Sequence, residues 1–528
     1  MASPSPIEHV FVIMLENRSF DNMLGLAGIE GVPPPPITEY SNTYKGNSYP
    51  VTGGAPTSMT SDPGHELLDV LQQLTNLAPS SFPPQLGPYP SNKIVHPDFP
   101  NGTGFVANYA TVADEEIPPP TAPHYGDIMK CFTAEQIPIL SQLAKEFAVC
   151  TRWHCSIPGP TWPNRFFVHL ASSNGLDCSP TLDQMSSWMT KGFSSPNGSI
   201  FEKMEGMEFP PKHKIYHDYD PNTFNSAFSD DPERGGGFKG MGWIPQVGCI
   251  KGIKYEDILF PLKEYFEADI NRYYPYAYTF IEPHYGEGRL NTYYGGSSQH
   301  PMDDVYGGEA LVKFVYEKLR QSPIWEKSLL IITYDEHGGF YDSVAPPGAP
   351  PPNDGSIPWG VSGTNNKFGF EFDQYGVRVP AIVISPWIQK NTVENTELYD
   401  HTSVLKTLEE IFNIPTLTDR DSRAKSVLNL LNLDSPRTDC PTDLGPLPPS
   451  SGPRLEFSEA EIEAMDQEPL PESGNLIGSM GILVKMDYEM SLKTQESESL
   501  LRTKIQNIKT RGQLKAYAAE VAEKLAGK

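Results

Sequence analysis

The chain has 528 residues, of which 38% are hydrophobic and 20% are charged, so it is long enough and apolar enough to bury a large core. Its formal net charge of −26 argues against binding to nucleic acid and against electrostatic docking on anionic membranes. No run of about 20 apolar residues is present, which argues against a transmembrane segment. The 53 prolines exceed the usual share of about 5% and predict long ordered loops.

An apolar run near the start of the chain breaks off into polar residues. Residues 9–15 read His-Val-Phe-Val-Ile-Met-Leu and precede Glu16 and Asn17. The run predicts a strand buried on both faces, as in a parallel sheet. Ligands of open α/β sheets bind beyond the carboxyl ends of such strands, and carboxylate and amide oxygens suit a hard metal ion. Taken alone, the segment fits a strand-to-loop turn held by local hydrogen bonds equally well.

Further apolar runs end in polar clusters, at residues 276–281, 329–334 and 379–384. A helical pattern covers residues 308–320, and another starts near Thr402 and Ser403, either of which can cap its helix. Strands that alternate with helices predict βαβ units and an α/β fold with a mostly parallel central sheet.

The composition divides the chain into segments: a catalytic domain at residues 1–440, a Pro-rich linker at residues 441–453 and a charged helical extension at residues 454–528. Within the first segment, residues 22–130 and 172–250 are rich in Pro, Gly, Ser and Asn, and we interpret them as long loop insertions. We expect a terminal helix from about residue 499 to residue 525. The extension could pack on the core, mediate contacts or hang free, and no chemistry is assigned to it.

Six cysteines without CxxC spacing favour buried free thiols, because a chain of this length needs no covalent staples. A Cys155–Cys178 or Cys131–Cys150 bridge stays open for a secreted form. No basic and apolar leader precedes the first strand, so we expect either a cytoplasmic protein or a secreted form that lacks its leader.

The sharpest candidate site is the sequence Asp335-Glu336-His337-Gly338-Gly339, directly after the third apolar run. Two adjacent carboxylates repel each other unless a cation lies between them, and a divalent metal would offset that repulsion. The two glycines permit a tight turn and a close approach of the backbone to a ligand. The alternative is a solvated acidic turn.

A candidate nucleophile, Thr161, precedes a helical pattern at residues 166–171, and Pro163 suits the first turn of that helix. Thr161 would then sit just before a helix N-terminus, where backbone N–H groups and the helix dipole favour a phosphate. A hydroxyl beside a metal at that place can act as a nucleophile. On position alone, a threonine that merely caps the helix is the favoured alternative.

Three histidines stand in polar segments: His65 within residues 62–66, His284 after the apolar run at residues 276–281, and His300 at the start of residues 300–304. Histidine can bind phosphoryl oxygens and protonate a leaving alkoxide. Each of them taken singly is more often a structural residue.

Several motifs occur in one specific order: Glu16-Asn17-Arg18-Ser19-Phe20-Asp21, Asp62-Pro63-Gly64-His65, Gly159-Pro160-Thr161 with Pro163-Asn164-Arg165, Asp335-Glu336-His337-Gly338-Gly339 and Gly376-Val377-Arg378-Val379-Pro380. Together they resemble the phosphoesterase family of phosphatidylcholine-type phospholipases C, plant non-specific phospholipases C and related acid phosphatases, over roughly residues 7–440. The resemblance implies an alkaline-phosphatase-like three-layer α/β/α fold.

The resemblance also implies an active site. Its nucleophile is Thr161, which would attack phosphorus in line and form a phospho-threonine that water hydrolyses. His65, His284 and His300 would line the phosphate pocket together with Asn17, and one of the three would protonate the leaving group; which one stays open. One divalent metal ion of unknown identity, with Ca²⁺, Mg²⁺ or Mn²⁺ favoured by all-oxygen ligation, would be held by Glu16, Asn17, Thr161, Asp335 and Glu336.

The leading hypothesis is a metal-assisted phosphoesterase that hydrolyses phospholipids in the manner of a phospholipase C, giving diacylglycerol and a phosphorylated alcohol, with peripheral contact to a membrane surface. The threonine nucleophile favours this branch, because the acid phosphatases have serine there. The alternative is an acid phosphatase that acts on small soluble phosphomonoesters. A non-catalytic binding protein of the same fold is a third hypothesis, but it predicts that the metal ligands or the nucleophile are missing, and both are present.

Overall fold

The computed structural model describes residues 5–76, 103–112, 119–218, 244–286, 293, 295–356, 365–449, 459–471, 475–491 and 493–526. Within these residues, a seven-stranded sheet of the order β11-β6-β10-β9-β1-β8-β7 forms the centre of the molecule. In this sheet, β10 alone runs against the direction of the other strands. The strands are β1 (His9–Leu15), β6 (Ala148–Cys150), β7 (Lys212–His217), β8 (Tyr276–Glu282), β9 (Ser328–Tyr334), β10 (Ala381–Ile384) and β11 (Thr392–Glu394).

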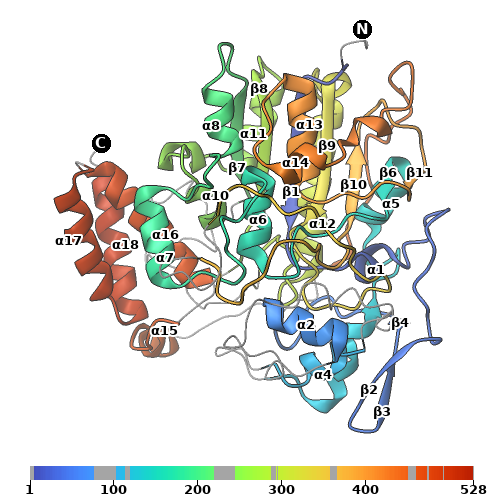
Figure 1. Cartoon of the computed structure of the whole chain (residues 1–528), viewed down its shortest axis with the longest axis horizontal. Helices are drawn as coiled ribbons and strands as arrows, with labels where there is room; N and C mark the ends of the chain where they lie inside the picture. The colour runs from blue at the N-terminus through green and yellow to red at the C-terminus, as the bar shows by residue number, and fades with distance from the viewer. Residues whose placement is uncertain are drawn as a thin grey trace.

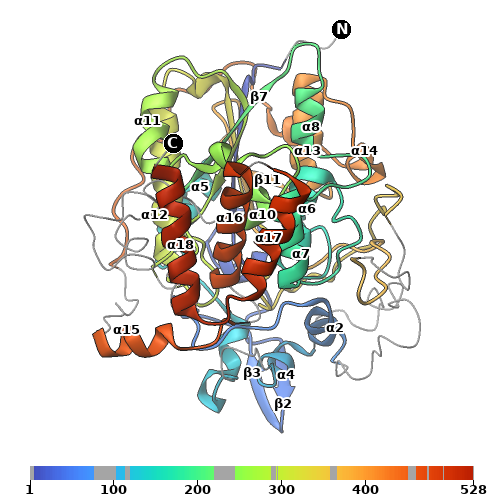
Figure 2. The same cartoon turned by 90° about the vertical axis from the view of Figure 1, so that its left-hand side faces the viewer.

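Helices cover both faces of the sheet, which gives the three layers that the resemblance implies (Figures 1 and 2). One face carries α5 (Pro138–Glu146), α11 (Leu262–Ile270) and α12 (Val305–Gln321), and the other carries α6 (Thr161–Leu170), α8 (Ile200–Glu205) and α13 (Thr402–Phe412). Shorter elements are α1 (Phe20–Leu24), α2 (Leu67–Thr75), α4 (Phe105–Tyr109), α7 (Leu182–Lys191), α10 (Pro245–Gly248), α14 (Asp419–Arg423), the 3₁₀ helices η2 (Ala122–Met129), η4 (Tyr255–Ile258), η6 (Trp325–Lys327) and η7 (Val427–Leu430), and the small strands β2 (Ser41–Tyr44), β3 (Asn47–Pro50), β4 (Thr52–Gly53) and β5 (Lys130–Cys131).

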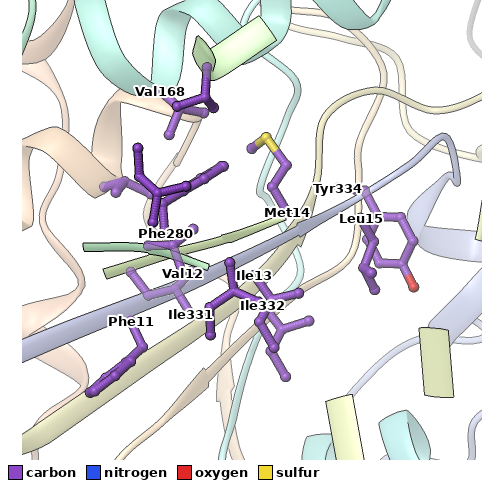
Figure 3. Close-up of a cluster of buried hydrophobic side chains, with 14 of the residues drawn as sticks. Phe11, Val12, Ile13, Met14, Leu15, Val168, Phe280, Ile331, Ile332 and Tyr334 are labelled. Carbon is purple, nitrogen blue, oxygen red and sulfur yellow. The ribbon is translucent and has the colours of Figure 1, made fainter. Parts of the chain in front are cut away.

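The predicted first strand, β1, lies within the buried core. All seven residues of β1 are buried, and Val12 pairs with Phe280 of β8 on one side and with Ile331 of β9 on the other. Figure 3 shows these side chains in a buried cluster that includes Val168 of α6. Burial of each such side chain contributes about 1.5–3 kcal/mol, which is why an apolar run without alternation forms a strand here.

The polar cluster that begins at Ser385 lies at the opposite end of the strands from the other polar clusters. The run that precedes Ser385 forms β10, which pairs antiparallel with β9, so its carboxyl end lies beside the start of β9. Ser385 Oγ donates to the Ser328 carbonyl at 3.0 Å. This cluster therefore takes no part in a site at the carboxyl ends of the parallel strands.

The segments interpreted as loop insertions contain regular structure as well. Residues 212–217, Lys-His-Lys-Ile-Tyr-His, form the edge strand β7, although their charged and polar character gave no apolar run. The helices α2 and α4 and the hairpin β2–β3 lie beyond the carboxyl ends of the parallel strands (Figure 1). This insertion therefore brings His65, next to α2, to the edge of the sheet where ligands bind.

The C-terminal extension packs on the rest of the protein. Its described helices are α15 (Glu459–Asp466), α16 (Asn475–Met490), α17 (Gln495–Gln506) and α18 (Arg511–Ala526). α16 lies against α7 and α10, and a Cβ added to Gly481 would be 3.1 Å from Met185 Sδ. Of the options left open, packing on the core is therefore the one observed; the boundaries of the three predicted segments stay a prediction, and residues 450–453 of the predicted linker lie outside the described residues.

The single terminal helix predicted at residues 499–525 was wrong, because α17 ends at Gln506 and α18 starts at Arg511. Gln513 N donates to Thr510 Oγ1 at 3.3 Å, and Gln513 Oε1 accepts from Thr510 N at 3.2 Å. This reciprocal capping starts a new helix.

The predicted cap of α13 was also wrong. The residue before the helix is His401, and its side chain makes no capping bond. The Thr402 hydroxyl donates to the Asp400 carboxylate, and Ser403 Oγ accepts from Asp400 N at 3.3 Å, so both hydroxyls serve the preceding turn.

All six cysteines lie in the described residues, and all are buried free thiols, as predicted. Among the described helices, none combines the length and the apolar character needed to cross a membrane.

Candidate active site

Four acidic side chains meet where three neighbouring strands end. Glu16 follows β1, Glu282 is the last residue of β8, and Asp335 and Glu336 follow β9. Because these strands are parallel neighbours, their carboxyl ends lie at one edge of the sheet. All four side chains are at most 3% exposed, which rules out a solvated acidic turn.

Thr161 is the first residue of α6, one position further into the helix than predicted. The residue before the helix is Pro160, and the helix start has no side-chain cap, so the alternative of a capping threonine is wrong. Asn164 holds the loop that leads into the helix: its Oδ1 accepts from Ile157 N at 3.0 Å, and its Nδ2 donates to the Gly159 carbonyl at 2.9 Å.

Asn17 connects the nucleophile candidate to the acidic cluster. Its Nδ2 donates to a Glu336 carboxylate oxygen and lies 3.4 Å from Thr161 Oγ1. Asn17 has a φ of 51°, a left-handed conformation that Asn tolerates better than most residues. Gly338 has a φ of 63°, so the tight turn predicted for this glycine is confirmed, and a Cβ added to it would lie 2.1 Å from the Asn17 carbonyl oxygen. A close approach to a ligand stays a prediction. The tight turns after β1 and after β9 thus bring the Asn17 and Glu336 side chains into contact.

The turn after β9 is held by its own backbone. Asp335 Oδ1 accepts from Glu336 N at 2.8 Å, and Glu336 Oε2 accepts from Gly338 N at 2.6 Å. His401, the residue before α13, forms a hydrogen bond from its Nε2 to the Asp335 carbonyl oxygen at 2.6 Å. These contacts fix the direction of both carboxylates.

Arg165 is the cation of the acidic cluster. It lies four residues after Thr161 on the same side of α6, and it is 1% exposed. Its Nη1 lies 2.7 Å from Glu282 Oε2, and its Nε lies 3.0 Å from Asp335 Oδ2 and 4.0 Å from Glu16 Oε1.

Two acids of the cluster, Glu16 and Asp335, resist ionisation. Burial raises the pKa of Glu16 well above its usual range, and the neighbouring Asp335 raises it further, whereas Arg165 lowers it. Burial likewise raises the pKa of Asp335 to about 6, against the opposing effect of Arg165. A cation in the cluster would favour the ionised forms.

Two of the predicted histidines lie beside this cluster. His65 Nδ1 is 3.6 Å from Glu336 Oε1. The His65 ring contacts the His300 ring edge-on, with 6.3 Å between the ring centroids. His300 Nε2 is 3.6 Å from Asp62 Oδ1, and Arg18 holds its loop by donating from Nε to the Gln299 carbonyl at 2.8 Å. Burial lowers the pKa of His300 well below its usual range, and His65 and Arg18 lower it further, so His300 is neutral at pH 7.

His284 lies further from the acidic cluster than His65, and the loop of Ser297 and Ser298 connects it to Glu16. Ser297 N donates to the His284 carbonyl at 2.7 Å, and Glu16 N donates to the carbonyl of the adjacent Ser298 at 2.7 Å. The structure thus places His284 next to the loop that touches Glu16, while its described hydrogen bonds go to backbone groups and to Ser297.

Residues 7–415 match the Phosphoesterase family. The chain belongs to this family. It is accordingly a phosphoric ester hydrolase. Non-specific phospholipase C3 of Arabidopsis thaliana is 33% identical over 85% of this chain and 77% of that protein, and non-specific phospholipase C6 of the same plant is 34% identical over 84% and 76%. Phospholipase C B of Mycobacterium tuberculosis (strain H37Rv) is 26% identical over 94% of this chain and 90% of that protein.

Solved structures show a remote likeness. A protein of the alkaline phosphatase superfamily from Vibrio parahaemolyticus is 14% identical, with a TM-score of 0.27 over 55% of this chain and 64% of that one. The phosphonate monoester hydrolase of Agrobacterium radiobacter is 10% identical, with a TM-score of 0.30 over 57% and 73%.

The donors of this phosphoesterase fit a hard metal ion in part. Glu16 Oε2 and Asn17 Oδ1 are buried and have no hydrogen-bond partner among the described residues, and oxygens of this kind are the ligands that Ca²⁺, Mg²⁺ and Mn²⁺ take. Within the described part of the chain, however, no group of three or more His, Cys, Asp or Glu side chains is arranged to hold a metal. A metal here would therefore need the amide of Asn17 and the hydroxyl of Thr161 as well.

Sequence reasoning gave no role to Arg165 or to Glu282, although both stand in segments that it singled out. The usable signal was the spacing of Arg165 from Thr161, which puts both on one side of a helix. A buried group of carboxylates also requires a cation, and Arg165 is the basic residue nearest to the nucleophile in the sequence.

Proposed function

We propose that this phosphoesterase hydrolyses phospholipids in the manner of a phospholipase C, with Thr161 as the nucleophile and one divalent metal ion as the cofactor. The single observation that carries the proposal is the Asn17 side chain, which links the hydroxyl at the start of α6 to the carboxylates after β9. The relatives that are named non-specific phospholipases C support the choice of substrate class.

The metal would be held by Glu16, Asn17, Thr161, Asp335 and Glu336. When bound, it would lower the pKa of the Thr161 hydroxyl and offset negative charge on the phosphate. The two buried acceptors without a partner, Glu16 Oε2 and Asn17 Oδ1, support this set.

The residues of the chain would act in two displacements. Thr161 loses its hydroxyl proton to water, and its Oγ1 forms a bond to phosphorus while the bond from phosphorus to the diacylglycerol oxygen breaks, which leaves the phosphorylated headgroup on Thr161. A second water then attacks the same phosphorus, the bond from phosphorus to Thr161 Oγ1 breaks, a proton returns to Thr161, and the phosphorylated alcohol is released. The start of α6 supports the phosphate position, since Pro160 and Pro163 have no N–H and the amides of Thr161 and Trp162 point out of the first turn.

A proton must reach the departing diacylglycerol oxygen. Burial lowers the pKa of His300 well below its usual range, whereas the His65 side chain is 22% exposed and can therefore exchange its proton with solvent. We therefore assign the proton donor to His65 and a phosphate-orienting role to His300, with His284 behind them. Peripheral contact with the membrane surface belongs to the same proposal, because the substrate resides in a bilayer.

The test compares lipid vesicles with a panel of soluble phosphomonoesters, using the metal-loaded protein. We expect release of diacylglycerol from vesicles of phosphatidylcholine and little turnover of the panel. Activity on the panel alone would refute the phospholipase assignment and favour an acid phosphatase.

A further inference from the structure

The Arg165 guanidinium lies at the meeting point of three strand ends. It contacts Glu282 after β8, Asp335 after β9 and, at 4.0 Å, Glu16 after β1. Its Nη2 donates to the Met14 carbonyl at 3.0 Å, so the backbone of β1 fixes it as well. With 1% exposure, this cation has no solvent to screen it.

Buried acidic side chains outnumber buried arginine and lysine side chains where these three strands end. Glu16, Glu282, Asp335 and Glu336 are all buried, and among the described residues Arg165 is the arginine or lysine that forms ion pairs with the first three of them. A buried cation near unpaired carboxylates attracts all of them, and it repels any second cation that binds to the same oxygens.

Glu282 holds Arg165 to one side of the cluster. Its contact with Arg165, at 2.7 Å, is the shortest of the three ion pairs, and its Oε2 also accepts from the Tyr285 hydroxyl at 2.6 Å. The Tyr285 ring faces the guanidinium, with its centroid 5.6 Å from Arg165 Cζ. Glu282 and Tyr285 thus limit how far Arg165 turns toward Glu16 and Asp335.

We propose that Arg165 is a cation built into the site, which competes with the divalent metal for Glu16 and Asp335, and that Glu282 is the counter-ion that restrains it. Arg165 then keeps the carboxylates together before metal binds, and Glu282 sets how strongly the metal binds. Both are positioning residues that act through the ligands. The inference rests on the proposed function, because it requires a metal at those ligands.

The charges predict effects of opposite sign. Arg165→Met removes the competitor, so the protein should bind a divalent ion at least about ten-fold more tightly than the unmodified chain. Glu282→Gln frees Arg165 to draw on Asp335 and Glu16, so binding should weaken by a similar factor. In the double variant Arg165→Met/Glu282→Gln the effect of Glu282→Gln should largely disappear, because it acts through Arg165.

The experiment titrates Mn²⁺ into metal-stripped protein and measures the dissociation constant by calorimetry, with thermal midpoints recorded in chelator and in Mn²⁺. Arg165→Met should lower the midpoint in chelator and recover it in Mn²⁺, because the ion stabilises the folded state in proportion to its affinity. The matched control is Arg420→Met. Arg420 is also buried, but its guanidinium donates to Asp400 and to the carbonyls of Ser156 and Phe372 and lies over the rings of Phe167 and Tyr375, so its loss should lower both midpoints equally.

The outcomes separate the two proposals. Mn²⁺ binding by the unmodified chain together with equal or weaker binding by Arg165→Met overturns the inference and leaves the metal proposal standing. Absence of Mn²⁺ binding by the unmodified chain overturns both. If Arg165→Met does not fold, the double variant decides: tighter binding than Glu282→Gln supports the inference, whereas equal or weaker binding overturns it and makes Glu282 a ligand or Arg165 a merely structural residue.

Discussion

Thr161 and Asn17 owe their mutual position to two short local structures. One is the left-handed turn after β1, at Asn17, and the other is the start of α6, where Thr161 is the first helical residue. Neither position is rigid by itself, but Gly338 and Asn164 fix the two from opposite sides. The reactive geometry thus depends on residues that need not touch the substrate.

Replacement of Thr161 by alanine should abolish hydrolysis, with a loss of about 10⁴-fold or more in kcat, because no other group can form the covalent bond. Thr161→Ser keeps the hydroxyl and should retain part of the activity. The measurement is steady-state kinetics on lipid vesicles, with thermal midpoints as the control for folding. Substantial turnover by the alanine variant would remove Thr161 as the nucleophile.

Buried histidines away from the site make stability depend on pH. His154 is buried and donates from Nδ1 to the Gly376 carbonyl at 2.8 Å; burial lowers its pKa from 6.5 to about 3. Because the folded-state pKa is the lower one, its contribution is complete above pH 6.5 and is lost as the pH falls toward 3, at about 1.4 kcal/mol per pH unit.

His154→Asn keeps a donor for the Gly376 carbonyl and does not titrate. Between pH 6.5 and pH 5, the unmodified chain should therefore lose about 2 kcal/mol more of its free energy of unfolding than this variant loses. Denaturant unfolding at both pH values measures the difference. Parallel pH profiles would contradict the assignment of a neutral buried ring.

At the scale of elements, α6 is the part of the fold that the site depends on most. It presents Thr161 and Arg165 on one side, and Asn164 ties its first turn to the preceding loop. The helix begins where the chain leaves Pro160, and its C-terminal cap, Ala171, has a left-handed φ of 53°. A shift of this start would move nucleophile and cation together.

Asn164→Ala should lower kcat by roughly 100-fold, because small misplacements of reacting groups have effects of that size. KM should change much less, since the residue lies behind the nucleophile. Asn164→Asp is the informative partner variant: it keeps the acceptor for Ile157 N and loses the donor to the Gly159 carbonyl. Kinetics of both variants check the point, and an unchanged kcat would show that the loop holds its shape without Asn164.

Apolar periodicity was enough to predict β1, β8 and β9, because these strands are buried on both faces and their sequences are continuously apolar. It failed for β7, which is an edge strand with Lys212, His213 and Lys214. It also could not give the direction of β10, since direction depends on the path of the chain between strands. The break between α17 and α18 was readable in principle from the Thr510 and Gln513 pair.

The same division holds for the site. The placement of Glu16, Asn17, Asp335 and Glu336 at one edge of the sheet was predictable because they follow directly after strands. The roles of Arg165 and Glu282 were not, because they arise from contacts between residues 117 positions apart in the sequence. A sequence pattern shows which residues are neighbours on one helix or strand. An ion pair such as Arg165–Glu282 depends on which elements are adjacent in the fold, and a local pattern does not show that.

For the whole molecule, the insertion that carries α2 and α4 lies beyond the ends of the parallel strands, and the C-terminal helices pack at one side (Figures 1 and 2). The formal net charge of −26 acts over the entire surface. It opposes approach to an anionic bilayer, and salt screens that repulsion over a Debye length of about 10 Å at 0.1 M.

Addition of an anionic lipid to phosphatidylcholine vesicles should therefore slow hydrolysis at low ionic strength, and added salt should restore the rate. Vesicles of zwitterionic lipid alone serve as the control, and their hydrolysis should depend little on salt. Faster hydrolysis of the anionic vesicles at low salt would point to a local basic surface that overrides the net charge.

The central claim is that phospholipids are hydrolysed in two displacements through Thr161. The most direct measurement is the stereochemical course at phosphorus, followed with a chiral phosphorothioate analogue of phosphatidylcholine in isotopically labelled water. Two successive in-line displacements predict retention of configuration in the released phosphorylated alcohol. Inversion would show a direct attack by water and contradict the covalent intermediate.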